Sequence, residues 1–129
     1  MKATGRFDVK LGPVASDAGT GLGRMSLDKV FHGEIEATSS GEMLTAMSAS
    51  GSSGAYVAVE RVRGTLLGKP GSFALVHRGV MTQGRQELSI TVVPDSGTGE
   101  LQGLEGTLVI RIEPGGAHFY DFAGTLPGH

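Results

Sequence analysis

The feature that most constrains the fold is a pair of alternating segments in residues 56–81. Every second residue along YVAVERVRG and along GSFALVHRG is apolar or glycine, apart from one ionisable residue in each segment. Leu67-Gly68-Lys69-Pro70 separates the two segments. A period of two is typical of β-strands that bury one face, and a glycine-containing turn between two such runs indicates a β-hairpin. We therefore expect antiparallel strands to build the core.

Two ionisable residues, Glu60 and His77, fall on the apolar face of this predicted hairpin. A turn centred on Gly68-Lys69 would place Glu60 directly opposite His77. Directly opposed side chains have Cβ atoms about 4.5–5.5 Å apart, which is close enough for a carboxylate and an imidazole to form a hydrogen bond. The sequence thus predicts a buried acid–imidazole pair.

The rest of the chain follows the same pattern, with runs rich in Val, Ile, Thr and Phe between turns. Further strands are predicted at residues 2–11, 24–38, 42–49, 87–93, 107–113 and 117–126, with a loop at 12–23 and a single helical turn at 99–104. The chain has 22 glycines in 129 residues, far above the average of roughly 7%, which favours frequent turns and bulges.

About eight antiparallel strands joined in sequence predict an all-β fold, a mostly up-and-down β-barrel formed by one domain over residues 1–129. Closure of a barrel removes the exposed strand edges that invite aggregation. A two-sheet sandwich is the alternative, but Greek-key sandwiches need long crossover connections. An eight-stranded barrel can be filled by side chains or can hold one small ligand.

The residue composition and the charge balance exclude several classes of partner and site. Eleven basic and 13 acidic residues leave no electrostatic footprint for nucleic acid or an anionic membrane, and the absence of cysteine excludes disulfides and thiolate metal sites. The start, MKATGRFDVKL, carries charges where a signal peptide needs an apolar run, and no run approaches the ~20 residues of a membrane-spanning helix. We expect a cytoplasmic protein without a cofactor.

Three segments together resemble a known family. RMSLDKVFHGEIEATSSGEM, GAYVAVERVRGTLLGKPGSFALVHRG and LSITVVPDSGTGELQGLEG are similar, in this order, to a bacterial family of domains of unknown function. That resemblance implies a small β-barrel with an architecture like that of allene oxide cyclase and, more distantly, of lipocalins. It implies Glu and His at positions 60 and 77 of the strand pattern, and it implies no reaction.

Three roles are open for Glu60 and His77. Glutamate could orient the imidazole while histidine acts as a general acid or base. The pair could instead anchor a ligand without chemistry, or satisfy itself and fix the strand register. Lys29 falls among Leu27 and Phe31 on an apolar face, where it could form a Schiff base, abstract a proton or pair with Glu60. Alternatively, a bulge at Gly33 turns it outward, or its ammonium reaches the rim.

Aromatic and methionine side chains are predicted to line the interior. Those assigned to a ligand site beside Lys29 are Phe31, Met43, Tyr56, Phe73 and Tyr120. Around a void they would form a mostly apolar pocket for a small apolar or weakly polar molecule, with proton transfer of the isomerase, cyclase or lyase type. Whether the chain is an enzyme is left open.

The alternative hypothesis is a structural or interaction protein with a packed interior. Its predicted outer faces carry Val57 and Val59 beside two arginines, and Ala74 and Val76 beside Arg78, a mixture that suits a homodimer interface. His32, Glu34 and Glu36 alternate on one strand face and indicate a solvated outer surface rather than a metal site.

Overall fold

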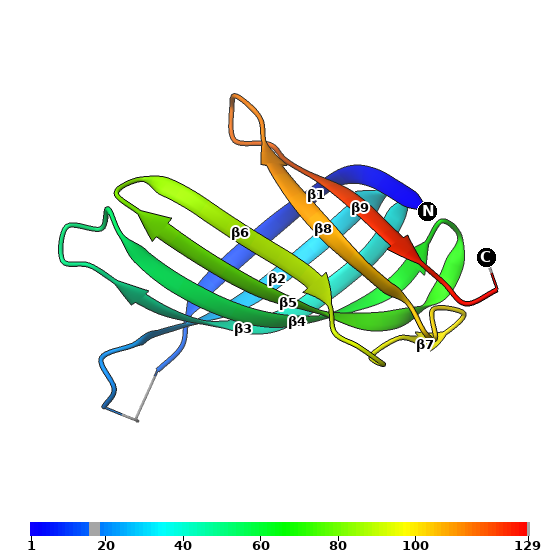
Figure 1. The fold of residues 1–129 in the computed structure, drawn as a ribbon, viewed down its shortest axis with the longest axis horizontal. Coiled ribbons are helices and arrows are strands. Elements are labelled where there is room, and N and C mark those ends of the chain that lie inside the picture. Colours follow the sequence, from blue (N-terminus) through cyan, green and yellow to red (C-terminus); the bar gives the residue numbers. More distant parts are fainter. Residues whose placement is uncertain (16–18, 129) are drawn as a thin grey trace.

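Antiparallel strands form almost all of the regular structure. The computed structural model describes residues 1–15 and 19–128. Its strands are β1 (Lys2–Pro13), β2 (Gly23–Gly33), β3 (Ile35–Met47), β4 (Gly54–Leu66), β5 (Lys69–Thr82), β6 (Arg85–Val92), β7 (Thr98–Gly99), β8 (Glu105–Ile112) and β9 (His118–Thr125) (Figure 1). The strands predicted at 2–11, 87–93, 107–113 and 117–126 are confirmed with small shifts at their ends. The predicted loop at 12–23 includes residues 16–18, which lie outside the described residues.

The sheet closes on itself, as predicted. Seven pairings join β1 to β2, β2 to β3, β3 to β4, β4 to β5, β5 to β6, β8 to β9 and β9 back to β1. The eighth, between β6 and β8, consists of one bridge between Thr91 and Thr107 within the described residues. The fold is therefore a closed eight-stranded antiparallel β-barrel with one weakly joined seam. The two-residue β7 adds only to the edge of β5.

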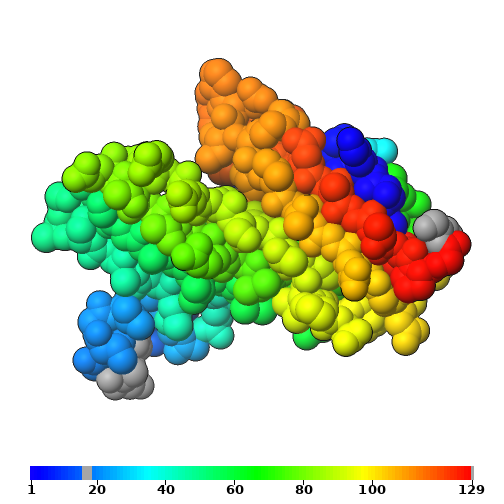
Figure 2. Space-filling model, viewed as in Figure 1, coloured from blue at the N-terminus to red at the C-terminus, as the bar shows by residue number. Residues whose placement is uncertain are grey.

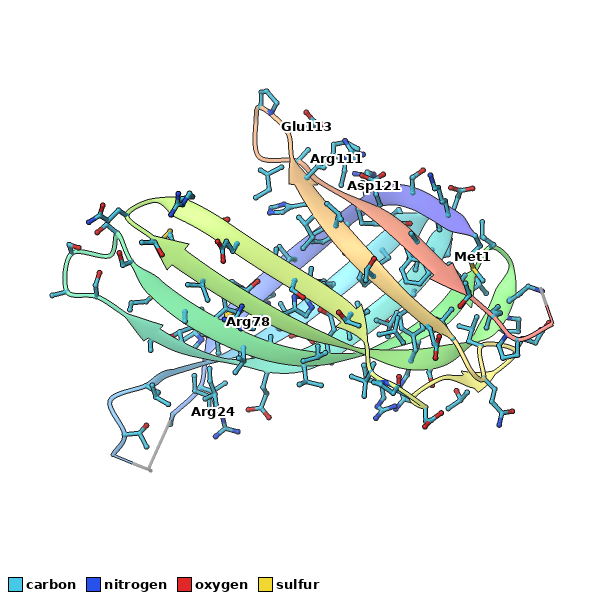
Figure 3. All side chains as sticks on the ribbon, viewed as in Figure 1. Met1, Arg24, Arg78, Arg111, Glu113 and Asp121 are labelled. Atoms are coloured by element: carbon cyan, nitrogen blue, oxygen red, sulfur yellow. The ribbon has the colours of Figure 1, made fainter. Side chains whose placement is uncertain are left out.

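The β8–β9 hairpin diverges from β6 beyond that bridge. Its tip projects away from the barrel in the ribbon and in the space-filling view, where a notch separates it from β6 (Figures 1 and 2). Arg111 donates to Asp121 at 2.6 Å and to Glu113 at 3.0 Å on this hairpin (Figure 3). The Arg111–Asp121 pair links β8 to β9 in the part of the hairpin where, among the described residues, β8 does not pair with β6.

The predicted long strand at 24–38 is wrong, because the chain reverses after Gly33. Phe31 pairs with Ala37 across the turn, so the strand predicted at 42–49 is the second half of β3. Gly33 has a φ of 107°, which a glycine adopts without steric cost. A β-carbon there would also press on the backbone of Thr4 and Gly5 in β1. This glycine makes a hairpin turn rather than the predicted bulge.

The central hairpin exists, but its predicted register is wrong by two residues. Leu66 pairs with Lys69, so the turn consists of Leu67 and Gly68, with φ values of 50° and 79°. Positive φ at both central residues is the pattern of a type I′ turn, whose twist matches that of the flanking strands. Because a shift of two preserves the side-chain face, the pair predicted to point inward still does so.

One end of the barrel is packed and the other is open. Residues 94–104 form turns on either side of β7 rather than the predicted helical turn, and they cover the end where β5 begins. The buried side chains there are Ile35, Leu66, Phe73, Leu101, Leu104, Tyr120, Phe122 and Leu126. At the opposite end the inward-facing residues are only partly buried or exposed, among them Met25, Met43, Tyr56, Met81 and Leu88. The barrel is therefore packed at one end and open at the other, with partly buried or exposed apolar side chains around the opening.

Candidate functional site

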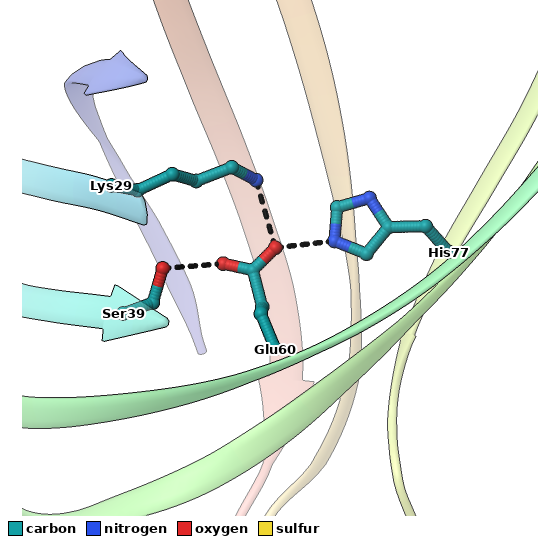
Figure 4. Close-up of polar contacts among 4 residues, drawn as sticks. All are labelled: Lys29, Ser39, Glu60 and His77. Atoms are coloured by element: carbon teal, nitrogen blue, oxygen red, sulfur yellow. Dashed lines mark hydrogen bonds and ion pairs between the residues drawn. The ribbon is translucent and has the colours of Figure 1, made fainter. Parts of the chain in front are cut away.

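Four polar side chains from four neighbouring strands meet inside the barrel (Figure 4). Glu60 Oε2 lies 2.9 Å from Lys29 Nζ and 2.5 Å from His77 Nε2, and Glu60 Oε1 accepts a hydrogen bond of 2.8 Å from Ser39. The exposed fraction of each residue is 5% or less. Charged groups this deeply buried are rare unless they are paired. Here the ion pairs and hydrogen bonds within the cluster offset the free-energy cost of burying its charges.

Small residues make room for this cluster. His77 faces Ala58 rather than Glu60, and Glu60 faces Leu75, so the imidazole reaches the carboxylate diagonally over a methyl group. On the other side, Glu60 pairs with Gly41. A β-carbon on Gly41 would collide with the backbone of Glu60, which indicates that β3 approaches β4 unusually closely at this point.

Lys29 and Ser39 complete the shell of donors around the carboxylate. They face each other across β2 and β3, and both point inward. The expectation that Lys29 turns outward or reaches the rim does not hold, and the alternative pairing with Glu60 does. The ammonium also lies 5.0 Å from the centroid of Phe7 and 5.8 Å from that of Phe31, where the ring faces add a cation–π attraction.

Glu60 is ionised in this environment. Burial by itself would raise the pKa of its carboxyl group, but the hydrogen bond from His77 and the charge and hydrogen bond of Lys29 outweigh burial and lower the pKa to about 2. The carboxylate therefore acts as an acceptor for all three neighbours. A carboxylate in this state can orient an imidazole and stabilise its protonated form.

His77 has one nitrogen engaged and one available. The nitrogen that faces an ionised carboxylate must carry the proton, so in the neutral ring Nε2 donates and Nδ1 keeps its lone pair. Nδ1 makes no hydrogen bond within residues 1–15 and 19–128. No fully buried side-chain nitrogen or oxygen in that part of the chain lacks a partner, so Nδ1 retains contact with accessible space. It is placed to accept a proton.

A pocket lies beside the site at the open end. It has a volume of about 190 Å³, and its lining includes Met47, Tyr56, Gly79, Met81 and Leu88. Gly79 is the next inward-facing residue after His77 on β5. A β-carbon at Gly79 would overlap the ring of Tyr56, so the glycine lets this ring lie flat against β5. The pocket is mostly apolar, although Gln86 and Glu87 also line it. His77 is not part of its lining and lies one inward-facing position deeper on β5 than Gly79.

The other predicted ligand-site residues divide between the two ends. Met43 pairs with Ala58 and is half-buried near the opening. Phe31 and Phe73 are packed in the core, Phe73 with its ring centroid 6.4 Å from that of Phe122. These two phenylalanines are separated from the pocket by the polar cluster.

Tyr120 is a structural residue of the closed end. Its hydroxyl accepts a hydrogen bond of 2.8 Å from the Ile35 amide and lies 2.9 Å from the His32 carbonyl, to which it donates. It therefore holds the β2–β3 turn and has no donor left for a ligand. Ser39 was missed by the sequence analysis, although it continues the inward phase of Ile35 and Ala37 once the turn at Gly33 is recognised.

The polar residues of the β2–β3 turn are engaged separately. His32 lies 3.3 Å from Asp8, Glu34 accepts from the Thr4 amide, and Glu36 accepts from the Gly33 amide. In the part of the chain that the structure describes, no group of three or more His, Asp or Glu side chains is arranged to hold a metal ion. Over the same residues, no helix has the length and apolar character to cross a membrane.

Two comparisons with known proteins, by family model and by solved structure, point to the same family. The family described as "Protein of unknown function (DUF3224)" matches residues 3–123. A crystal structure of a DUF3224 protein of unknown function from Shewanella oneidensis MR-1 is 53% identical, with a TM-score of 0.92 over 100% of this chain and 98% of that one. Comparison with curated proteins finds no match.

Proposed function

The chain belongs to the DUF3224 family of proteins of unknown function, and from that premise we propose that the open end of its barrel binds a small apolar or weakly polar molecule. Glu60 and His77 are the polar anchors of this site. The observation that carries the proposal is the nitrogen of His77 without a hydrogen bond among the described residues, one inward-facing position below a mostly apolar pocket, while a buried carboxylate holds the other nitrogen.

Two further observations support binding. The pocket is mostly apolar, with Tyr56, Gln86 and Glu87 as the polar side chains in its lining, which is the usual composition of a small-molecule site. At about 190 Å³ it is smaller than the roughly 300–1,000 Å³ of sites for drug-sized ligands, so the ligand is a small one. The acid–imidazole pair suits isomerase, cyclase or lyase chemistry, in which a proton is removed and returned.

Binding of 2-naphthol tests the proposal, because this molecule is small, fluorescent and apolar apart from one hydroxyl group. Titration of the protein should give saturable binding through the hydrogen bond to His77. Glu60→Gln and His77→Ala should each weaken the affinity about 3- to 10-fold, the equivalent of one hydrogen bond, while unfolding stays cooperative.

His32→Ala is the matched control, since His32 also faces a carboxylate but on the outer surface. Its affinity for 2-naphthol should equal that of the unchanged protein. The contrary outcome is a Glu60 or His77 variant that loses cooperative unfolding, while the molecules that remain folded bind naphthol as well as the unchanged protein. In that case the pair stabilises the fold and takes no part in binding.

The second candidate function is an interaction protein that forms a homodimer through its outer sheet face. Leu44, Val57, Val59 and Val76 lie in adjacent positions on β3, β4 and β5 and are 39–54% exposed. Arg78 and the Arg24–Glu42 ion pair border them, with Arg24 projecting away from the barrel (Figure 3). Ala74, expected in the same face, is instead buried beneath Ser96, which accepts from its amide. Two expectations from the sequence are not tested by the structure or by the comparisons. The cytoplasmic location and the likeness to allene oxide cyclase therefore stay predictions.

A further inference from the structure

We infer that the ligand is a small apolar carbonyl compound with an acidic α-hydrogen, and that Tyr56 and His77 act on it together. This inference rests on the proposed function and names the substrate class of the same site. Tyr56 would donate a hydrogen bond to the carbonyl oxygen, and His77 Nδ1 would remove the α-proton.

The register places His77 one inward-facing position below Tyr56, which lines the pocket. Tyr56 pairs with Gly79 and Ala58 pairs with His77, so Tyr56 and His77 are diagonal neighbours across β4 and β5. Diagonal positions in a sheet lie about 7–8 Å apart, so the aromatic side chains at these two positions can reach the same small molecule. Glu60 is the next inward residue beyond Ala58, on the far side of the imidazole from Tyr56.

Tyr56 keeps an available hydroxyl group. The hydroxyl makes no hydrogen bond within the described residues, and it is not a fully buried atom that lacks a partner. Its ring lies against Gly79, which holds the side chain in the pocket wall. Burial and the negative charge of Glu60 raise the pKa of Tyr56, so the hydroxyl stays protonated at neutral pH. It can therefore donate but not act as a base.

The chemistry is a balanced proton shift. The lone pair of Nδ1 takes the α-proton, the C–H electron pair becomes the enolate double bond, and the carbonyl oxygen gains the negative charge. The Tyr56 hydroxyl stabilises that oxygen, as hydrogen-bond donors do in oxyanion sites. Glu60 stabilises the imidazolium through Nε2. Return of the proton at another carbon yields an isomer and restores the neutral ring, so no co-reactant is needed.

Cyclohex-3-enone is a suitable probe, because moving one proton converts it to the conjugated cyclohex-2-enone, which is followed by ultraviolet absorbance. The protein should accelerate this conversion over buffer. His77→Gln keeps a donor for Glu60 but removes the base, and should lower the rate by about 10²-fold or more. Tyr56→Phe removes only the hydroxyl and should lower it by about 10²-fold or down to the buffer rate. His32→Ala should match the unchanged protein.

The outcomes separate this inference from the proposed function. Conversion no faster than in buffer, while 2-naphthol still binds, overturns the carbonyl chemistry and leaves binding standing. Failure of both probes overturns both. An unchanged rate in folded Tyr56→Phe protein overturns the role of Tyr56, and an unchanged rate in His77→Gln overturns that of the base. Circular dichroism and cooperative urea unfolding confirm that each variant is folded.

Discussion

At the scale of single residues, Glu60 determines the properties of the interior. An isolated buried carboxylate would be too costly to ionise, yet three donors surround this one and lower its pKa to about 2. The carboxylate in turn holds Nε2 of His77 and leaves Nδ1 without a hydrogen bond among the described residues. One carboxylate therefore links the stability of the barrel to the proposed binding site at its open end.

The stability of the barrel should depend on pH through Glu60. A carboxyl group whose pKa falls from its ordinary 4.5 to about 2 on folding contributes its full stabilisation above pH 4.5 and loses it as the pH falls toward 2. We expect roughly 2 kcal/mol of the unfolding free energy to disappear between pH 6 and pH 3. Urea denaturation of the unchanged protein and of Glu60→Gln measures this term as the difference between them. A difference that stays constant over this range would contradict it.

At the scale of elements, two-residue turns set the register of the strands. The β4–β5 and β5–β6 hairpins both turn through a residue and a glycine with positive φ, Leu67-Gly68 and Gln83-Gly84. Neither Leu67 nor Gln83 is a residue that favours this conformation. The turn is kept because it matches the twist of long strands and because the Leu67 amide donates to the Glu34 carbonyl at 2.8 Å.

Leu67→Asn should stabilise the protein, because asparagine tolerates the left-handed conformation that leucine pays about 1 kcal/mol to adopt. The expected gain in unfolding free energy is about 0.5–1 kcal/mol, measured by thermal or urea denaturation. Leu67→Ala is the matched variant, since it loses the same apolar side chain without the conformational advantage. If the Asn and Ala variants are equally stable, strain in this turn does not limit stability.

At the scale of the whole molecule, the two ends of the barrel differ in how they are packed. Leu101 and Leu104 close one end, and Tyr120 ties β9 to the β2–β3 turn there. Within residues 1–15 and 19–128 no such cover lies over the opposite end, and the weak β6–β8 seam opens toward it (Figure 1). The buried apolar contacts are therefore concentrated at the closed end, and the proposed ligand site lies at the open end.

The outer apolar face predicts association of two copies. A homodimer should appear as twice the chain mass of 13.3 kDa in sedimentation equilibrium at high concentration. Val59→Lys should return the protein to the monomer, because it places a charge in the centre of the exposed aliphatic group. Val109→Lys is the control, since Val109 is similarly exposed on β8, away from this face. A strictly monomeric unchanged protein would exclude the dimer.

The sequence by itself determined the strand class, the eight-stranded barrel and the inward direction of Glu60 and His77, because the side-chain period of two is a local property that survives a register shift of two residues. It did not determine the register of the central hairpin, the reversal at Gly33 or the union of Lys29 and Ser39 with Glu60. Those depend on turn geometry and on contacts between distant segments, such as that of Tyr120 with Ile35. Only the tertiary structure decided which end of the barrel is packed, because residues 94–104 must fold back across one opening to bury their leucines.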